Sequence, residues 1–167
     1  MRKNEISFYT VSDKYISYLR SFDNKVHHQY PNGESIYVGI VLKTNGINYF
    51  VPLSSYSENK DKKMKKRNRL IIRLFEHNNL DNPLGYLLFN NMIPVPESEL
   101  FSINLDLDIK KHRMMQKQLI FMKGNLDRIE NKAKQTYRKR LEEDEYFIKM
   151  CCDFQLLEEK YLLYYSE

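Results

Sequence analysis

The spacing of the apolar residues changes near Lys111, and this change constrains the fold more than any other feature. Before it, short runs rich in β-branched and aromatic residues predict strands; after it, apolar residues recur every three or four positions. Strands first and helices last indicate the α+β class, with an antiparallel sheet flanked by helices. No repeat or linker interrupts the sequence, so we expect a single domain over 1–167.

Five strands are expected, over 6–11, 36–43, 49–53, 69–75 and 86–89. Asn45-Gly46 predicts a tight hairpin turn between the second and the third, because both residue types accept a positive φ. Ser12 is expected to cap a short helix over 13–22. Residues 92–96 contain two prolines and are expected to leave the sheet, since proline cannot continue a central strand.

Two amphipathic helices are expected in the last third of the chain. The stripe from Met115 to Tyr137 predicts one helix of about seven turns that packs on the sheet, and a second helix is expected over 146–161. Cys151 and Cys152 are adjacent, so they are expected as reduced core residues. The sequence shows no apolar leader and no run of 18 apolar residues, which favours a cytoplasmic protein without a membrane span.

Nearly all the excess positive charge lies in one segment. The formal net charge is +5, whereas the segment Lys60–Arg69, with seven cations and one anion, alone carries +6. We expect a flexible loop that binds a polyanion, although a solvated loop that only keeps the protein soluble is the alternative. The candidate phosphate-binding residues of this loop are Lys60, Lys62, Lys63, Lys65, Lys66 and Arg67.

Ser54 and Ser55 stand between a strand end and this loop, and they are the best candidates for chemistry. RNA can be cleaved by its own 2′-OH, so a protein need only orient that hydroxyl, neutralise the developing charge and help the leaving group. Hydroxyls and ammonium groups can do this without a metal, although composition alone favours an ordinary loop start. The sequence shows no glycine-rich phosphate loop, dinucleotide fingerprint or metal-ligand spacing, so we expect no cofactor.

Two other groups leave alternatives open. Asp106 and Asp108 would share one face of a strand and could bind a divalent ion, but we favour a solvated acidic turn. His27 and His28, in a polar loop over 27–35 near Tyr30, could act in acid–base chemistry, although paired loop histidines are more often solvated.

Six blocks of the sequence carry a resemblance to a known family. They are Phe8–Leu19, Tyr37–Leu42, Tyr49–Ser55, Asn91–Pro96, Lys117–Phe121 and Cys152–Tyr161. In this order they resemble the ToxN/AbiQ family, the endoribonuclease toxins of type III toxin–antitoxin and abortive-infection systems. Together they cover nearly the whole chain.

The resemblance implies both a fold and an activity. The fold would be the interferase-like fold of toxin nucleases, with a strongly curved antiparallel sheet. The activity would be metal-independent cleavage of cellular or phage RNA, not DNA, to leave a 2′,3′-cyclic phosphate. A small repeat antitoxin RNA, folded as a pseudoknot and processed by the toxin itself, would inhibit it in a closed protein–RNA assembly.

Residue roles follow from the resemblance by position. The family's hydroxyl pair falls on Ser54 and Ser55, and its helix tyrosine on Tyr15. Some members have a lysine two residues after the second hydroxyl, where this chain has Ser57, so Lys60, Lys62 or Lys63 would have to reach back. The expected catalytic set is Ser54, Ser55, Lys60, Lys62 and Tyr15. The expected RNA-binding set is Tyr30, Ser57, Lys63, Lys65, Lys66, Arg67, Lys117, Gln118, Phe121, Lys123 and Lys134.

Two other functions remain open at this point. A non-catalytic RNA-binding antiphage module would use the same basic groove without needing the serine pair. A metal nuclease would depend on Asp106 and Asp108 and would lose activity in EDTA.

Overall fold

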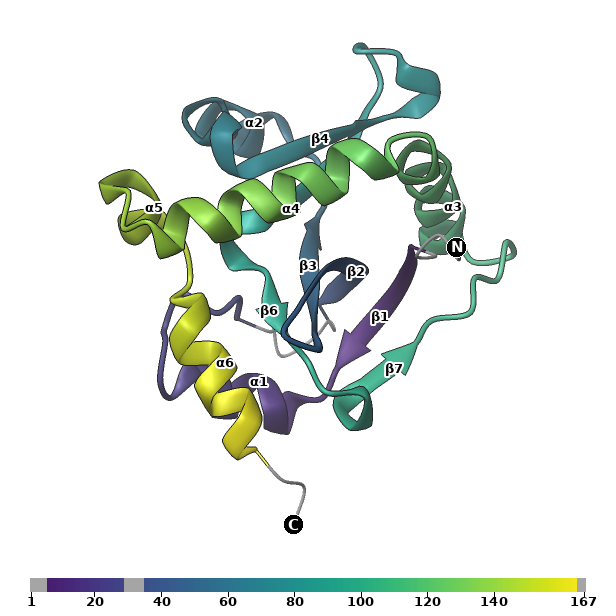
Figure 1. The fold of residues 1–167 in the computed structure, drawn as a ribbon. Helices are drawn as coiled ribbons and strands as arrows, with labels where there is room; N and C mark the ends of the chain where they lie inside the picture. The colour runs from purple at the N-terminus through teal and green to yellow at the C-terminus, as the bar shows by residue number, and fades with distance from the viewer. Residues whose placement is uncertain (1–5, 29–34, 165–167) are drawn as a thin grey trace.

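The computed structural model describes residues 6–28 and 35–164. Within these ranges the strands form one antiparallel sheet, and the helices lie around it (Figure 1). The strands are β1 (Ser7–Val11), β2 (Ile36–Thr44), β3 (Ile47–Ser54), β4 (Ile71–Phe75), β5 (Pro83–Leu88), β6 (Ile93–Pro94) and β7 (Leu100–Ser102). Their order in space is β4-β5-β3-β2-β1-β7, and β6 also pairs with β3. The expected α+β class is confirmed.

The helices pack around this sheet, and the green α4 crosses in front of it in Figure 1. They are α1 (Asp13–Arg20), α2 (Glu58–Met64), α3 (Lys110–Lys123), α4 (Leu126–Leu141), α5 (Glu145–Met150) and α6 (Phe154–Leu163). Single 3₁₀ elements are η1 (Lys65–Leu70), η2 (Glu76–Asn78), η3 (Phe89–Asn91) and η4 (Glu97–Glu99). None of the described helices is long and apolar enough to cross a membrane.

Local signals explain several element boundaries. Ser12 caps α1 as expected, because its Oγ accepts the amide of Tyr15 at 3.1 Å. Asn45 and Gly46 have φ values of 53° and 76°, the left-handed conformations that a tight hairpin turn needs. The hairpin formed by β2 and β3 is therefore confirmed.

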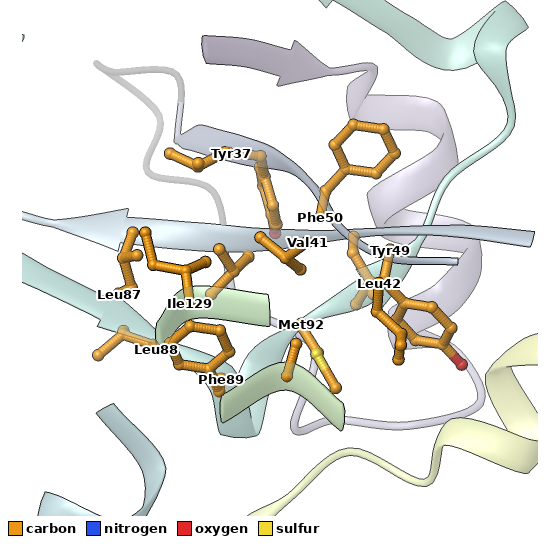
Figure 2. Packing of buried hydrophobic residues seen from close by; sticks show 14 of the residues in the cluster. Tyr37, Val41, Leu42, Tyr49, Phe50, Leu87, Leu88, Phe89, Met92 and Ile129 are labelled. Atoms are coloured by element: carbon orange, nitrogen blue, oxygen red, sulfur yellow. The ribbon is translucent and has the colours of Figure 1, made fainter. Parts of the chain in front are cut away.

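The core lies between the sheet and α4. Figure 2 shows Ile129 of α4 among side chains of β2 and β5, including Val41 and Leu87, and all three are at most 2% exposed. Ala133, one turn further along α4, is fully buried too. Burying a side chain of the size of Ile129 contributes about 1.5–3 kcal/mol to stability, so the apolar stripe of α4 holds this helix on the sheet. The core role expected for the Met115–Tyr137 stripe is confirmed.

The prediction of a single long helix over 111–137 is wrong, because the helix is interrupted at Gly124 and Asn125. Gly124 ends α3, and its amide still donates to the carbonyl of Ile120 at 3.2 Å. Asn125 then leaves the helical conformation at φ −133°, and its side-chain amide donates to the carbonyl of Phe121 at 2.8 Å. The apolar stripe continues across this interruption, because α3 and α4 both pack their apolar side chains against the core.

The helix expected over 146–161 is also two helices, α5 and α6. Cys151 is extended, and the amide of Cys152 donates to the carbonyl of Asn90 at 2.9 Å, which ties this segment to η3. Asp153 then caps α6 by accepting the amide of Leu156 at 3.2 Å. Both cysteines are free and buried, as expected.

Two predictions about the sheet and the basic segment are corrected. Residues 92–96 do not leave the sheet, because Ile93 and Pro94 form β6 opposite Phe50 and Tyr49 of β3. Pro94 lacks an N–H but keeps a carbonyl acceptor, which a strand of two residues tolerates. The segment Lys60–Arg69 is not a flexible loop either, since it forms most of α2 and η1.

Gly85 of β5 provides a test of how tightly β5 approaches the end of β3. Its φ is +141°, and a Cβ there would lie 2.5 Å from the carbonyl oxygen of Ser54, closer than atoms can approach. Gly85→Ala should therefore lower the free energy of unfolding by about 2–4 kcal/mol. Gly46→Ala is the matched control, because Gly46 has φ +76° with open space around it, and should lower it by about 1 kcal/mol. Equal losses in urea unfolding would contradict the close approach.

Candidate active site

The sheet places the serine pair where β3 ends. Ser54 is the last residue of β3 and pairs with Tyr86 of β5, which fixes its backbone. Ser55 follows outside the ladder with an exposed side chain. The two hydroxyls are thus held at one end of the sheet, with the second accessible to a ligand.

Lys60 turns back onto both serines. Ser57 caps α2, with its Oγ accepting the amide of Lys60 at 3.1 Å, so the helix begins directly after the serine pair. The Nζ of Lys60 lies 3.1 Å from the Oγ of Ser54 and 3.2 Å from the Oγ of Ser55, and it also donates to the Ser55 carbonyl at 3.0 Å. Of the three lysines considered from the sequence, Lys60 is the one that reaches the hydroxyls. Ser57 itself acts as a helix cap.

Asp61 anchors α2 to the sheet from the other side. Its Oδ1 accepts the hydroxyl of Tyr86 at 2.9 Å and the Nε of Arg73 at 3.1 Å. Arg73 also donates to Asn68 of η1 at 2.6 Å, so the helix and the turn after it are tied to β4 and β5. Burial raises the pKa of Asp61, but the hydrogen bonds from Tyr86 and Arg73 outweigh it and hold this pKa below its ordinary value.

A pocket of about 310 Å³ opens in front of the serines. His27, Lys111 of α3 and Gln118 of α3 line it together with the serines and Lys60, and among the lining residues that the structure describes none is an Asp or a Glu. Its charged side chains are therefore ammonium groups, which suits an anionic ligand such as a phosphodiester. His27 and Lys111 come from segments far apart in the sequence, and no local pattern indicated that they meet there.

Tyr15 and Phe121 lie in the core instead of the pocket. Tyr15 is fully buried, its hydroxyl donates to the Pro94 carbonyl at 2.6 Å, and burial raises its pKa far above the ordinary value. Phe121 is 6% exposed and packs edge-on against Phe75. Their burial does not support the catalytic role expected for Tyr15 or the RNA-binding role expected for Phe121.

The other predicted residues are spread over the surface and its edges. Gln118 is buried and donates to the Leu84 carbonyl at 2.8 Å, yet it borders the pocket. Lys117 pairs with Glu76 at 3.3 Å. Tyr30 lies outside the described residues. The remaining predicted residues all have exposed side chains, as Ser55 and Lys117 do, and are Lys62, Lys63, Lys65, Lys66, Arg67, Lys123 and Lys134.

A second cationic surface lies where η1 meets α4. The Nζ of Lys132 donates to the carbonyl of Arg69 at 3.3 Å, and burial, with the charges of Arg128 and Arg69, lowers the pKa of Lys132. No carboxylate of the described residues forms an ion pair with these three cations. A hollow of about 740 Å³ continues this surface along α4, lined by Arg128, Asn131, Lys132, Lys134, Gln135 and Arg138.

The acidic alternative for a site is not supported. The Oδ1 of Asp106 accepts the amide of Asp108 at 3.0 Å, which forms the solvated turn that we favoured before α3. Within the described ranges, no three His, Cys, Asp or Glu side chains come together as a metal site would require.

An antiparallel sheet that presents two hydroxyls and an ammonium group in a basic pocket is typical of a small α+β protein that acts on phosphodiesters. Residues 7–162 match the family described as "Toxin ToxN, type III toxin-antitoxin system". The chain belongs to this family.

Individual relatives agree with this assignment. The chain is 58% identical to Endoribonuclease AbiQ of Lactococcus lactis subsp. lactis, covering 95% of this chain and 89% of that protein. It is 37% identical to Endoribonuclease ToxN of Bacillus thuringiensis subsp. kurstaki, covering 95% and 84%.

Two solved structures show the same fold. One is AbiQ, a lactococcal anti-phage endoribonuclease of a type III toxin–antitoxin system, with a TM-score of 0.91, 59% identity and coverage of 95% of this chain and 97% of that one. The other concerns selective toxin inhibition by a non-coding RNA pseudoknot in type III systems, with a TM-score of 0.84, 35% identity and coverage of 98% and 99%.

Asp61→Asn should reveal how much the carboxylate anchor of α2 contributes. A depressed Asp pKa stabilises the fold above the ordinary value of 3.8, and this contribution disappears as the pH falls through the pKa of the folded state. The variant should therefore be less stable than the parent by about 1 kcal/mol at pH 7 in urea unfolding, and the difference should shrink as the pH falls below 3.8. Asp81→Asn, at an exposed turn, is the control. A difference independent of pH would contradict the role of the charge.

Proposed function

We propose that this protein is an endoribonuclease toxin of a type III toxin–antitoxin system that acts in abortive phage infection. The observation that carries the proposal is the contact of the Lys60 ammonium with both serine hydroxyls in a basic pocket. Membership of the ToxN family and the names of the relatives, which are endoribonucleases, support the same activity. The substrate is cellular or phage RNA, and the protein works in the cytoplasm as a single domain.

Cleavage proceeds by attack of the ribose 2′-OH on the adjacent phosphorus, which leaves a 2′,3′-cyclic phosphate. The Ser55 hydroxyl donates a hydrogen bond to the phosphate, and Lys60 neutralises the charge that develops on its oxygens. Ser54 holds Lys60 from the sheet side at 3.1 Å, so the ammonium group is oriented before RNA binds. No step of this scheme is assigned to a metal.

A small repeat antitoxin RNA is the proposed inhibitor. A related structure is described in terms of selective toxin inhibition by a non-coding RNA pseudoknot, and another in terms of a processed non-coding RNA that regulates a bacterial antiviral system. By analogy, the antitoxin folds as a pseudoknot, is cut by the toxin and remains bound in a closed protein–RNA assembly.

RNA follows a cationic path from the pocket over α2 and η1 to α4. The described carboxylates form no ion pair with Lys63, Lys65, Lys66 or Arg67 on this path. Lys134 continues the path along the hollow on α4, and Lys117 and Lys123 of α3 are the other cations proposed to contact RNA. Such a surface binds phosphates without reading sequence.

Ser55→Ala tests the activity and separates it from the alternative, a non-catalytic RNA-binding module. Removing a group that contacts the transition state should lower the cleavage rate by roughly a hundredfold or more, while RNA affinity changes little. Single-turnover cleavage of a labelled mixed-sequence RNA in EDTA is the measurement. Full cleavage by a folded Ser55→Ala protein would overturn the assignment, and failure of the parent protein to cleave would favour the binding module.

Lys60→Gln should lose activity on the same scale, and Lys62→Gln is the matched variant. Both substitutions remove one charge from α2, but residues two apart on a helix point to different faces, and the Lys62 side chain is exposed. Lys62→Gln should therefore reduce cleavage only through weaker RNA binding, an effect that high RNA concentration removes. Equal loss at saturating RNA would mean that the ammonium contact with the serines is not the catalytic one.

The cationic surface at η1 and α4 predicts a salt effect. Arg128→Gln combined with Lys132→Gln should weaken RNA binding and reduce the slope of log affinity against log salt by roughly one to two units. Stability should change little, because relief of the repulsion between these cations offsets loss of the hydrogen bond from Lys132 to the Arg69 carbonyl. Lys14→Gln with Lys43→Gln, two exposed lysines on α1 and β2, is the control of equal charge. An unchanged slope in the first double variant would exclude this surface from the RNA path.

A further inference from the structure

The proposed cleavage needs a group that the serine pair and Lys60 do not provide. When the 2′-oxygen attacks phosphorus, its proton must pass to an acceptor. An ammonium group carries three donors and no acceptor, and a serine hydroxyl is too weak a base to take a proton near neutral pH. Lys60 and the serines can therefore stabilise charge but cannot start the reaction.

His27 is the residue in the right place for this task. It lines the same pocket as Ser54, Ser55 and Lys60. The remaining side chains of the lining that the structure describes are aliphatic, hydroxyl, thioether, amide or ammonium groups, and none of them is a carboxylate. Among these lining residues, an imidazole is the one group whose ordinary pKa lies close to neutrality.

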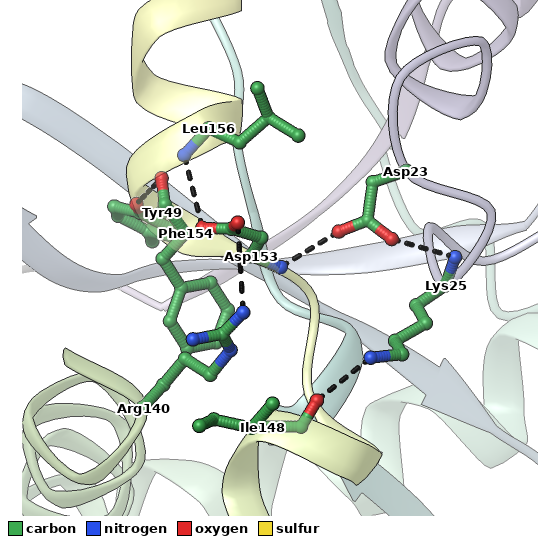
Figure 3. Close-up of polar contacts among 8 residues, drawn as sticks. All are labelled: Asp23, Lys25, Tyr49, Arg140, Ile148, Asp153, Phe154 and Leu156. Carbon is green, nitrogen blue, oxygen red and sulfur yellow. Dashed lines mark hydrogen bonds and ion pairs between the residues drawn. The ribbon is translucent and has the colours of Figure 1, made fainter. Parts of the chain in front are cut away.

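Several hydrogen bonds hold the backbone that leads to His27. The carbonyl of Lys25 accepts Nδ2 of Asn91 at 2.7 Å, and Arg20 donates to the carbonyl of Val26. Figure 3 shows the same segment from the other side, where Asp23 accepts the amide of Lys25 at 3.0 Å and the Lys25 ammonium donates to the carbonyl of Ile148 at 2.8 Å. Val26 is 1% exposed and buried in the core.

We propose that His27 is the general base of the reaction, an inference that rests on the proposed function. The neutral imidazole accepts the proton of the 2′-OH while the 2′-oxygen forms its bond to phosphorus. The bond from phosphorus to the 5′-oxygen breaks, and this oxygen takes a proton from water. Lys60 hydrogen-bonds the phosphate throughout, and the imidazolium later returns its proton to solvent.

The charges around His27 favour the neutral form that a base requires. Burial lowers the pKa of His27, and the positive charges of Arg20, His28 and Lys60 lower it further. Lys111 adds a fourth cationic group to the pocket from α3. The rate should therefore be constant near pH 7 and fall on the acid side, with a midpoint below the ordinary value of 6.5.

His27→Ala tests the inference in single-turnover cleavage of a labelled mixed-sequence RNA. The rate should fall by roughly 10²–10⁴-fold, the acid limb of the pH profile should disappear, and added imidazole should restore part of the rate. His27→Asn should be equally slow, because it keeps a polar side chain that cannot accept a proton near neutral pH. RNA affinity should stay within a few-fold of the parent value.

His28→Ala is the matched control, since His28 is the exposed neighbour and does not line the pocket. It should keep the parent rate near pH 7 and keep the acid limb, whose midpoint should move slightly upward because one neighbouring positive charge is removed. The inference would be overturned if a folded His27→Ala protein retained the parent rate or kept the acid limb. It would also be overturned if added imidazole restored no activity to His27→Ala and His28→Ala lost as much activity. Absence of cleavage by the parent protein would instead refute the proposed function, so the two failures are distinguishable.

Discussion

The sheet and the site both depend on β3, because this strand is hydrogen-bonded along both edges. β2 pairs with one edge, while β6 and β5 divide the other, β6 opposite Tyr49 and Phe50 and β5 opposite Leu53 and Ser54. A strand paired on both sides cannot slip by one residue without turning its buried side chains outward. The backbone of Ser54 is therefore set by the register of the whole sheet, and Ser55 occupies the first position beyond that constraint.

Lys60 and Asp61, two neighbouring residues of α2, have different electrostatic roles at the site. Successive residues of a helix point about 100° apart, so Lys60 faces the serines while Asp61 faces β4 and β5. The carboxylate is occupied by Arg73 and Tyr86, and the ammonium is held by neutral oxygens that do not cancel its charge. An anion entering the pocket thus meets a cation that no described carboxylate compensates and that the serines have already oriented.

The parts of the fold predicted from the sequence were those that a local pattern determines. The alternating runs and Asn45-Gly46 indicated the central hairpin, and the stripe through Ile129 indicated the core face of the later helices. The interruption at Gly124 could not be predicted, because glycine is tolerated inside helices. Ser57 was not recognised as a helix cap, because the charged residues after it were interpreted as a loop. His27 could not be placed, since its position depends on a chain path that no local pattern describes.

The departure at Ser57 shows that the site is defined by where an ammonium group lies and not by its offset along the chain. Here Ser57 starts a helix at that position, and one turn later the chain has returned close enough for Lys60 to contact both serines. The helix adds an advantage, because Asp61 and the Ser57 cap restrict Lys60 more than a loop would. In this chain the hydroxyl pair fixed by the sheet thus takes its cation from the first turn of a helix.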